Sequence, residues 1–351
     1  MSKGLSRRRW LAGSSIAAMS YGFTHSIQAE TTVNWSSTAA IQCQATDFRD
    51  RVGTGVVLTA LAASPGGESL AAAGEDRRIR IIHTADLTTT QTLIGHRDRI
   101  RSLAFDREGR FLASAGNDGQ LFLYDCAADY QTTHRFAGNP ALSDVAFGPR
   151  DPRLAIVGFS GRVTVIDPDH QTSRGFDCGS RDLRAVAFRD DLGVLAVGGR
   201  DGRLLLLDPD DGQIIAAETL HRGRIRGLCF HRQSNGIVSI GEDGTAIVYD
   251  TKNQRVLHRI EVSPGKLFSV SVLNSQLVAV AGSDNQIRIL NTDEGKVVRG
   301  LEDHIGSVTC LASTGTSLLS AGFDATLRRW SVGSGTTQTE RIADSDPTKD
   351  R

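Results

Sequence analysis

The chain has 351 residues, of which 39% are hydrophobic and 23% charged, and its 40 basic residues balance its 40 acidic residues. This composition is typical of a soluble globular protein, and the sequence has no apolar run long enough to cross a bilayer. A net charge of zero gives no general attraction to nucleic acid, so we expect no nucleic-acid partner.

The N-terminal residues 1–29 are predicted to be an export signal. Residues 6–11 read SRRRWL, and a weakly apolar segment rich in Ala, Gly and Ser follows over residues 11–23. This order resembles the twin-arginine export signal, with Arg7 and Arg8 as the arginine pair. A basic, disordered N-terminus is the alternative. The resemblance implies a periplasmic or otherwise exported protein, which has no membrane span after the signal is removed.

Beyond a lead-in at residues 30–39, expected to be flexible, the chain consists of repeats. The segment 95–125 contains three strand-like runs, at residues 100–105, 111–115 and 121–124. The second turn between them contains Asp-Gly, which supplies the positive φ of a tight hairpin. A fourth run follows each third one. The segment begins with Gly-His and ends with an aromatic residue and Asp.

The same pattern recurs every 41 or 42 residues, as expected of stacked or radially arranged units. In four of the first strands the fourth and sixth places hold bulky residues, and in three of these the third and fifth places hold small ones. Because successive side chains point to opposite faces, each sheet should present one bulky and one small face, which can nest around a ring. The first strands are predicted to begin at Leu58, Ile100, Leu142, Leu183, Ile225, Leu267 and Val308.

Over residues 40–335 the repeat resembles the WD-repeat β-propeller family. The resemblance implies an all-β fold, a seven-bladed β-propeller of four-stranded antiparallel blades. Only Trp330 keeps the family tryptophan of the third strand, so the chain is a degenerate member. In this family the N-terminal strand often completes the last blade, which favours residues 40–45 over the competing residues 336–342. Residues 336–351 are otherwise expected to be a polar tail.

Three repeats contain Ser, His and Asp at equivalent positions, the residue types of a hydrolase triad. The set recurs three times and lacks a Gly-x-Ser-x-Gly elbow, which argues against catalysis. In the WD-repeat family these types form a structural hydrogen-bond network with the third-strand aromatic residue. Where the His is absent the Ser is absent too, as at Ile156, Val197 and Val280. The predicted networks are His96, Ser114, Asp118 and Tyr124; His221, Ser239, Asp243 and Tyr249; and His304, Ser320, Asp324 and Trp330.

The loops that precede the first strands are rich in arginine. In this fold they emerge around the channel mouth, where guanidinium groups can hold carboxylates through paired hydrogen bonds. The alternative is compositional, because arginine is the chain's usual cation and interleaved Asp residues would neutralise part of the field. We expect a protein or acidic peptide partner, and the residues predicted to bind it are Arg99, Arg101, Arg184, Arg224 and Arg226.

We therefore expect a non-catalytic, exported, monomeric scaffold that binds a protein or peptide through its loop face. The alternative is a propeller enzyme, either lactonase-like or a quinone-dependent oxidoreductase. Such enzymes need inward-facing ligands, whereas the equivalent inner places of the first strands here hold mostly Ser, Ala, Gly and Cys, and among them only Asp144 is charged. The five cysteines include no CxxC pair. We therefore expect no metal, no cofactor and no catalytic residue.

Overall fold

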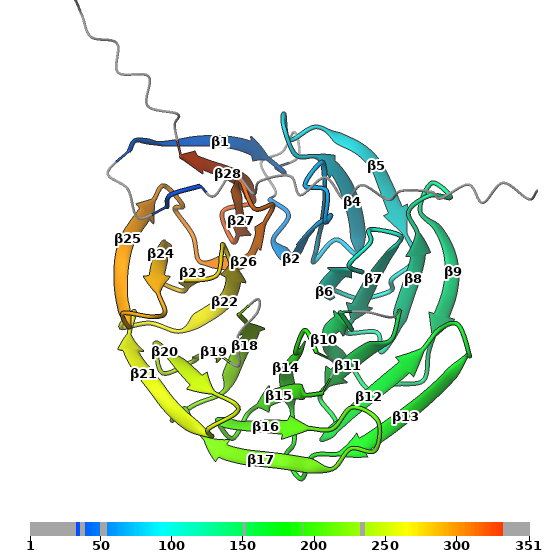
Figure 1. Cartoon of the computed structure of the whole chain (residues 1–351). Helices are drawn as coiled ribbons and strands as arrows, with labels where there is room; N and C mark the ends of the chain where they lie inside the picture. Colours follow the sequence, from blue (N-terminus) through cyan, green and yellow to red (C-terminus); the bar gives the residue numbers. More distant parts are fainter. Residues whose placement is uncertain are drawn as a thin grey trace, which may run out of the picture. The chain divides into compact units, whose positions relative to one another are not determined.

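The computed structural model describes residues 33–35, 39–49, 55–149, 152–191, 193–231 and 236–332. Every regular element in these residues is a β-strand, and the strands form seven antiparallel, four-stranded sheets. Figure 1 shows the sheets standing as blades around a central axis. The predicted fold class, an all-β seven-bladed β-propeller, is confirmed. The predicted signal at residues 1–29 and the predicted tail at residues 336–351 lie outside the described residues. In the described part, no helix has the length and apolar character that a membrane span requires.

The strands are numbered along the chain, and the first strand of each blade is the innermost (Figure 1). Blade 1 contains β2 (Leu58–Ala63), β3 (Ser69–Gly74), β4 (Arg78–His83) and β5 (Thr89–Ile94). Blade 2 contains β6 (Ile100–Phe105), β7 (Phe111–Gly116), β8 (Leu121–Asp125) and β9 (Gln131–Phe136). Blade 3 contains β10 (Leu142–Phe147), β11 (Leu154–Gly158), β12 (Arg162–Asp167) and β13 (Thr172–Asp177). Blade 4 contains β14 (Leu183–Phe188), β15 (Leu195–Gly199), β16 (Arg203–Leu207) and β17 (Ile214–Thr219).

The remaining blades follow the same order. Blade 5 contains β18 (Ile225–Phe230), β19 (Gly236–Gly241), β20 (Thr245–Asp250) and β21 (Arg255–Glu261). Blade 6 contains β22 (Leu267–Val272), β23 (Leu277–Gly282), β24 (Gln286–Asn291) and β25 (Lys296–Glu302). Blade 7 contains β26 (Val308–Ser313), β27 (Leu318–Gly322) and β28 (Thr326–Val332), with β1 (Ile41–Asp47) as its outer strand. The seven inner strands begin at the residues predicted from the repeat.

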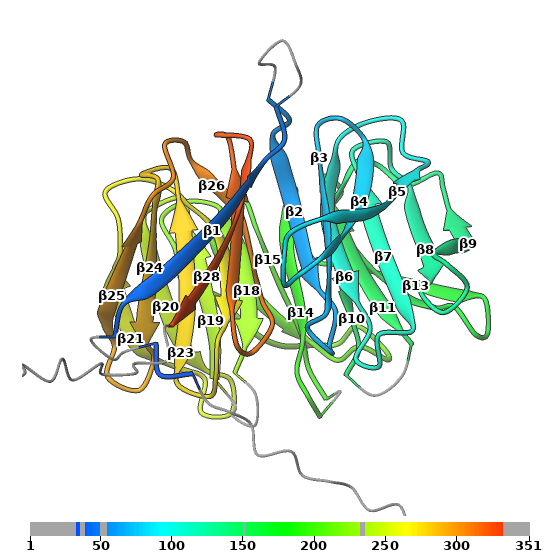
Figure 2. The same cartoon turned by 90° about the horizontal axis from the view of Figure 1, so that it is seen from above.

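The N-terminal strand closes the ring. β1 pairs antiparallel with β28 along its whole length, with Cys43 opposite Trp330, and Figure 2 shows β1 crossing beside β28. This pairing confirms the prediction that the N-terminal strand completes the last blade. The competing segment, residues 336–342, lies outside the described residues, and the edge of β28 is already occupied.

The core consists of layers between neighbouring blades. Between blades 4 and 5, Ala185 and Ala187 of the small face of β14 share one buried cluster with Phe230, Ile237 and Tyr249 of blade 5. Small side chains on one sheet leave room for large ones on the next, so the two faces can approach closely. The predicted nesting of a bulky face against a small face is therefore what holds neighbouring blades together.

Trp35 departs from the flexible lead-in expected at residues 30–39. Its side chain is 1% exposed and belongs to the buried cluster that also contains Leu301, Leu318 and Trp330. An indole with apolar neighbours on several sides loses its contact with water and stabilises the fold accordingly. Trp35 thus packs against blade 6 and against blade 7, which β1 completes.

Gly119 explains the tight hairpin predicted between β7 and β8. Its φ is 69°, a left-handed conformation that residues with a Cβ rarely adopt. A Cβ at this position would lie 2.0 Å from the carbonyl oxygen of Asn139 in the loop that leads into blade 3. Glycine is therefore needed here both for the turn and for the approach of the next blade.

Candidate functional site

A repeated irregularity shapes the channel mouth. In every blade the pairing of the inner strand with its neighbour shifts between the first and third residues, so the second residue is a β-bulge without a cross-strand partner. The bulged residues line a channel pocket of about 300 Å³ together with the third and fourth residues. The bulged residues are Thr59, Arg101, Ser143, Arg184, Arg226, Phe268 and Thr309.

Arg101 differs from the other predicted arginines in its partners. Its Nε donates a hydrogen bond to Asn117 Oδ1 at 2.9 Å, and it forms no ion pair with any described residue. Burial, and then repulsion by Arg99, Arg184 and Arg226, lower the pKa of Arg101 to about 10, against the opposing charge of Asp98. The guanidinium is still protonated at neutral pH, but it is partly desolvated and surrounded by like charge. A bound anion would relieve both effects.

Arg184 and Arg226, by contrast, are paired with the chain's own carboxylates. Arg184 Nε lies 2.5 Å from Asp182 Oδ1, and Arg226 Nη2 lies 2.7 Å from Glu242 Oε1. Arg224 joins the two acids, because its Nη2 lies 2.8 Å from Asp182 Oδ2 and its Nη1 lies 2.9 Å from Glu242 Oε1. Burial lowers the pKa of Arg224, but the hydrogen bonds and charges of Glu242 and Asp182 outweigh that and raise it. These three arginines form one charged network that ties blade 4 to blade 5.

Arg99 forms an ion pair with Glu75 of blade 1. Four of the five arginines predicted to bind a partner therefore already have a carboxylate partner within the chain. The alternative to a functional arginine face was that nearby acids neutralise the arginines. These four arginines are paired with acids in that way. Arg101 differs, because it forms no ion pair with a described residue, although the charge of Asp98 acts on it.

Apolar side chains lie beside the arginines. The Arg184 guanidinium carbon is 4.0 Å from the centre of the Phe159 ring, which is 43% exposed, and Arg226 lies 5.7 Å from the Phe268 ring centre. Stacking of this kind fixes the orientation of a guanidinium and leaves its edge open to a ligand. The loops of blade 7 on the same face carry Ile305, which at 78% is the most exposed large hydrophobic side chain of the described residues.

The Ser, His and Asp residues of three blades are brought together as three buried networks. In blade 2 His96 Nδ1 lies 3.0 Å from Asp118 Oδ1, and Nε2 lies 2.8 Å from Ser114 Oγ. Because Nδ1 faces a carboxylate it carries the proton, so Nε2 accepts the serine hydroxyl. The equivalent distances are 3.0 and 2.9 Å at His221 and 2.7 and 2.7 Å at His304. The arrangement links the loop before each inner strand to the hairpin between the second and third strands.

The third-strand aromatic residues differ between these networks. Trp330 Nε1 donates to Ser320 Oγ at 2.8 Å. Burial raises the pKa of Tyr124, and a hydrogen bond with Ser114 opposes that rise. The buried hydroxyl of Tyr249, however, has no hydrogen-bond partner among the described residues. The expectation that all three aromatic residues join their networks is therefore not met at Tyr249.

Blade 6 also differs from what the sequence predicted, namely that a blade with Val280 in place of the serine has no hydrogen-bond network. Ser263, in the position of the missing histidine, donates to Asp284 Oδ2 at 2.7 Å. Arg288 Nη1 lies 2.6 Å from the same carboxylate oxygen. A serine and an arginine thus replace the histidine on Asp284. No signal in the sequence pointed to Arg288, because it belongs to the third strand.

Asp144, the charged residue predicted on the inner wall, connects three blades. Its Oδ1 accepts hydrogen bonds from Ser102 Oγ of blade 2, at 2.7 Å, and from its own neighbour Val145 N, at 2.9 Å. Its Oδ2 accepts from Val186 N of blade 4, at 3.0 Å. Burial raises the pKa of Asp144 to about 6, although these hydrogen bonds oppose the rise. Among the described residues, no group of three or more His, Cys, Asp or Glu stands together as a metal site would require.

Comparison with known proteins adds the following. Residues 45–83, 87–125, 212–250 and 295–331 match the family described as WD domain, G-beta repeat. The chain is 27% identical over 281 residues to Striatin-4 of Homo sapiens, which covers 70% of this chain and 37% of that protein. It is 20% identical over 251 residues to Autophagy-related protein 16 of Arabidopsis thaliana, covering 69% of this chain and 49% of that protein.

A third relative is the guanine nucleotide-binding protein subunit beta of Saccharomyces cerevisiae, 21% identical over 208 residues, or 55% of this chain and 48% of that protein. The chain spans about half or less of the length of these relatives, and none of the three names denotes an enzyme. The four repeat matches, the seven blades and the three His–Ser–Asp networks together support placing this chain among the WD-repeat β-propellers.

Proposed function

We propose that this chain is an exported, non-catalytic scaffold that binds an acidic segment of a protein partner across its channel mouth. The likeness to WD-repeat proteins supports its coarser part, a protein-binding scaffold without catalysis. Export rests on the order of the SRRRWL motif and the apolar segment at the N-terminus. The acidic nature of the ligand rests on the mouth itself.

The observation that carries the ligand class is the position of Arg101. Its guanidinium is half-buried in the channel wall and, among the described residues, is hydrogen-bonded to the neutral Asn117 alone; Arg99, Arg184 and Arg226 repel it more than Asp98 attracts it. A carboxylate placed there would gain charge-assisted hydrogen bonds without first having to displace an acid of the chain. Arg184 would remain paired with Asp182 and Arg226 with Glu242, and both side chains would line the binding site, with Phe159 stacked on Arg184.

The test is the binding of a short peptide of alternating Glu and Gly, compared with its Gln and Gly analogue. Arg101→Gln should weaken binding of the acidic peptide by about 1.5–3 kcal/mol, or roughly tenfold to a hundredfold in Kd. Arg101→Lys should recover only part of the loss, because an ammonium cannot form the paired hydrogen bonds. Isothermal titration measures both.

A matched control is Arg107→Gln, since Arg107 is exposed beyond the other end of the same strand, β6, and its one hydrogen bond within the described part of the chain is to the Pro149 carbonyl, at 3.4 Å. This variant should bind like the wild type. If the Gln peptide binds as well as the Glu peptide, or if Arg101→Gln and Arg107→Gln behave alike, the ligand is not recognised by its charge at this mouth.

A further inference from the structure

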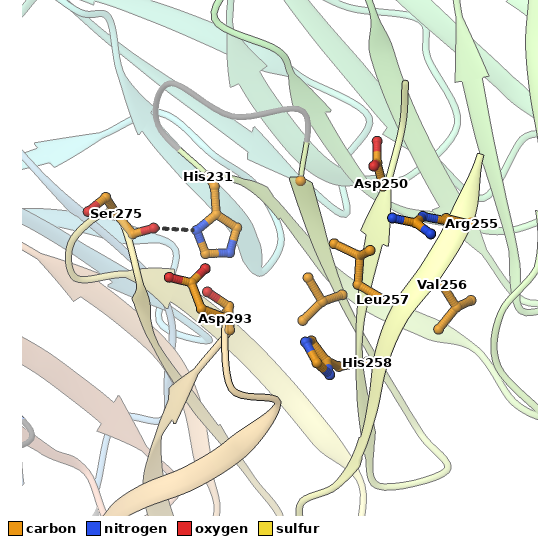
Figure 3. Close-up of a pocket in the computed structure, with 11 residues that line it drawn as sticks. His231, Asp250, Arg255, Val256, Leu257, His258, Ser275 and Asp293 are labelled. Atoms are coloured by element: carbon orange, nitrogen blue, oxygen red, sulfur yellow. Dashed lines mark hydrogen bonds between the residues drawn. The ribbon is translucent and has the colours of Figure 1, made fainter. Parts of the chain in front are cut away.

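A second depression lies between blades 5 and 6, at the end of these blades that is opposite to the channel mouth. β18 begins beside the mouth at Ile225 and ends at Phe230, and His231 follows it at the far end. His231, Asp250 and the first residues of β21 form one side of a groove of about 570 Å³, and Ser275 and Asp293 of blade 6 form the other (Figure 3). Neither the mouth arginines nor the three His–Ser–Asp networks take part in it.

His231 is a deeply buried polar group of this groove. Its side chain is 4% exposed, and its Nδ1 lies 3.2 Å from the carbonyl oxygen of Ser275. A carbonyl oxygen only accepts, so Nδ1 carries the hydrogen. Burial lowers the pKa of His231, against the opposing effects of the Ser275 hydrogen bond and the Asp293 charge. The neutral ring therefore has its lone pair on Nε2.

This lone pair is without a donor. Nε2 is buried and has no hydrogen-bond partner among the described residues. Figure 3 shows it turned away from Ser275, toward the side of the groove where Leu257 and His258 lie. A buried acceptor of this kind costs free energy until a donor reaches it. His231 Nε2 can therefore accept a hydrogen bond from an N–H or O–H group of a ligand in the groove.

The surroundings favour a donor that carries positive charge on an apolar stem. Asp293 is close enough to act on the pKa of His231, and its Oδ2 accepts one side-chain hydrogen bond, from Gln276 Nε2 at 2.8 Å. Val248 and Leu257 supply apolar surface, and the Leu257 side chain is 41% exposed. Asp250 and Arg255 face each other at the rim, where their charges offset each other.

We infer that this groove binds a basic side chain, lysine or arginine, of a partner segment. The terminal N–H donates to His231 Nε2, its charge faces the Asp293 carboxylate, and its methylene stem lies against Val248 and Leu257. The two ends of the propeller would then select opposite chemistry, with acids at the channel mouth and a base in the groove between blades 5 and 6. This site is independent of the proposed function, because it shares no residue with the mouth.

The probe is Nα-acetyl-lysine methylamide, with the arginine compound as a second probe and the norleucine compound as an uncharged control of equal stem. Titration into the full chain, labelled with ¹⁵N, should shift the His231 Nε2 resonance with the lysine or the arginine compound and leave it unchanged with norleucine. In ligand-observed NMR, His231→Phe and Asp293→Asn should each weaken binding at least tenfold. Asp169→Asn, which changes an exposed aspartate at the matching place of blade 3, should bind like the wild type.

Asp293 is exposed, so its variant tests the site even where His231→Phe disturbs folding. The inference is overturned if the norleucine compound binds as tightly as the lysine compound, since the groove is then merely apolar. It is equally overturned if Asp293→Asn and Asp169→Asn are indistinguishable, or if neither basic probe shifts the Nε2 resonance at any concentration tested.

Discussion

Replacing Ser320 by alanine should destabilise the propeller more than the same change at Ser239. Ser320 Oγ is fully buried and has two partners, His304 Nε2 at 2.7 Å and Trp330 Nε1 at 2.8 Å. Ser239 Oγ is as deeply buried but has one partner among the described residues, His221 Nε2 at 2.9 Å, since the Tyr249 hydroxyl makes no hydrogen bond to it. Ser320→Ala thus leaves two buried polar atoms without a partner, and Ser239→Ala leaves one.

Each orphaned atom costs about 1–3 kcal/mol, so Ser320→Ala should lower the free energy of unfolding by about that much more than Ser239→Ala. Urea denaturation followed by circular dichroism measures the difference. A double variant isolates its cause. In the Trp330→Phe background, which removes the indole N–H, Ser320→Ala should cost only about as much as Ser239→Ala does in the wild type. Equal urea midpoints for the two single variants would refute the reasoning.

Three further outcomes are expected. Arg7→Lys with Arg8→Lys keeps the charge but removes the pair that the twin-arginine pathway reads, so export to the periplasm, measured by cell fractionation, should stop; export at the normal rate would point to another route. Trp35→Ala should cost about 3–5 kcal/mol in urea denaturation, because its indole is 1% exposed within the blade 6 and 7 cluster, whereas a change within experimental error would contradict that packing. The pKa of Asp144 is about 6 in the folded state against an ordinary 3.8, so the folded state binds more protons than the unfolded state between these pH values. The stability of the wild type relative to Asp144→Asn should therefore fall as the pH rises from about 3.8 to 6, by at most about 1.4 kcal/mol per pH unit. A difference in stability that does not change with pH would contradict the raised pKa.

The repeat predicted the blades well because each is a local unit. The even period and the alternation of bulky and small residues belong to consecutive positions, and they located the start of every inner strand, such as Ile100 and Leu267. The closing strand, β1, could be predicted only through the family resemblance, because its partner β28 lies almost the whole chain away.

The details of the mouth could not be predicted, because they depend on contacts across blades and on the backbone. A bulge at Arg101 leaves the residue pattern of the strand unchanged while altering its pairing. The ion pair of Arg224 with Asp182 joins residues 42 positions apart, which only the ring brings together. Trp35 could not be assigned to the core either, since the polar residues around it in the sequence resemble a linker.

The central claim is that a protein partner binds at the mouth through Arg101. The most direct measurement is the Kd of the partner captured from the periplasmic fraction, for the wild type and Arg101→Gln, over a range of salt concentrations. The account predicts a Kd that rises with salt for the wild type, and a loss of roughly tenfold to a hundredfold in affinity with a weaker salt dependence for the variant. An unchanged Kd in a folded Arg101→Gln variant would contradict it and place the partner on another surface.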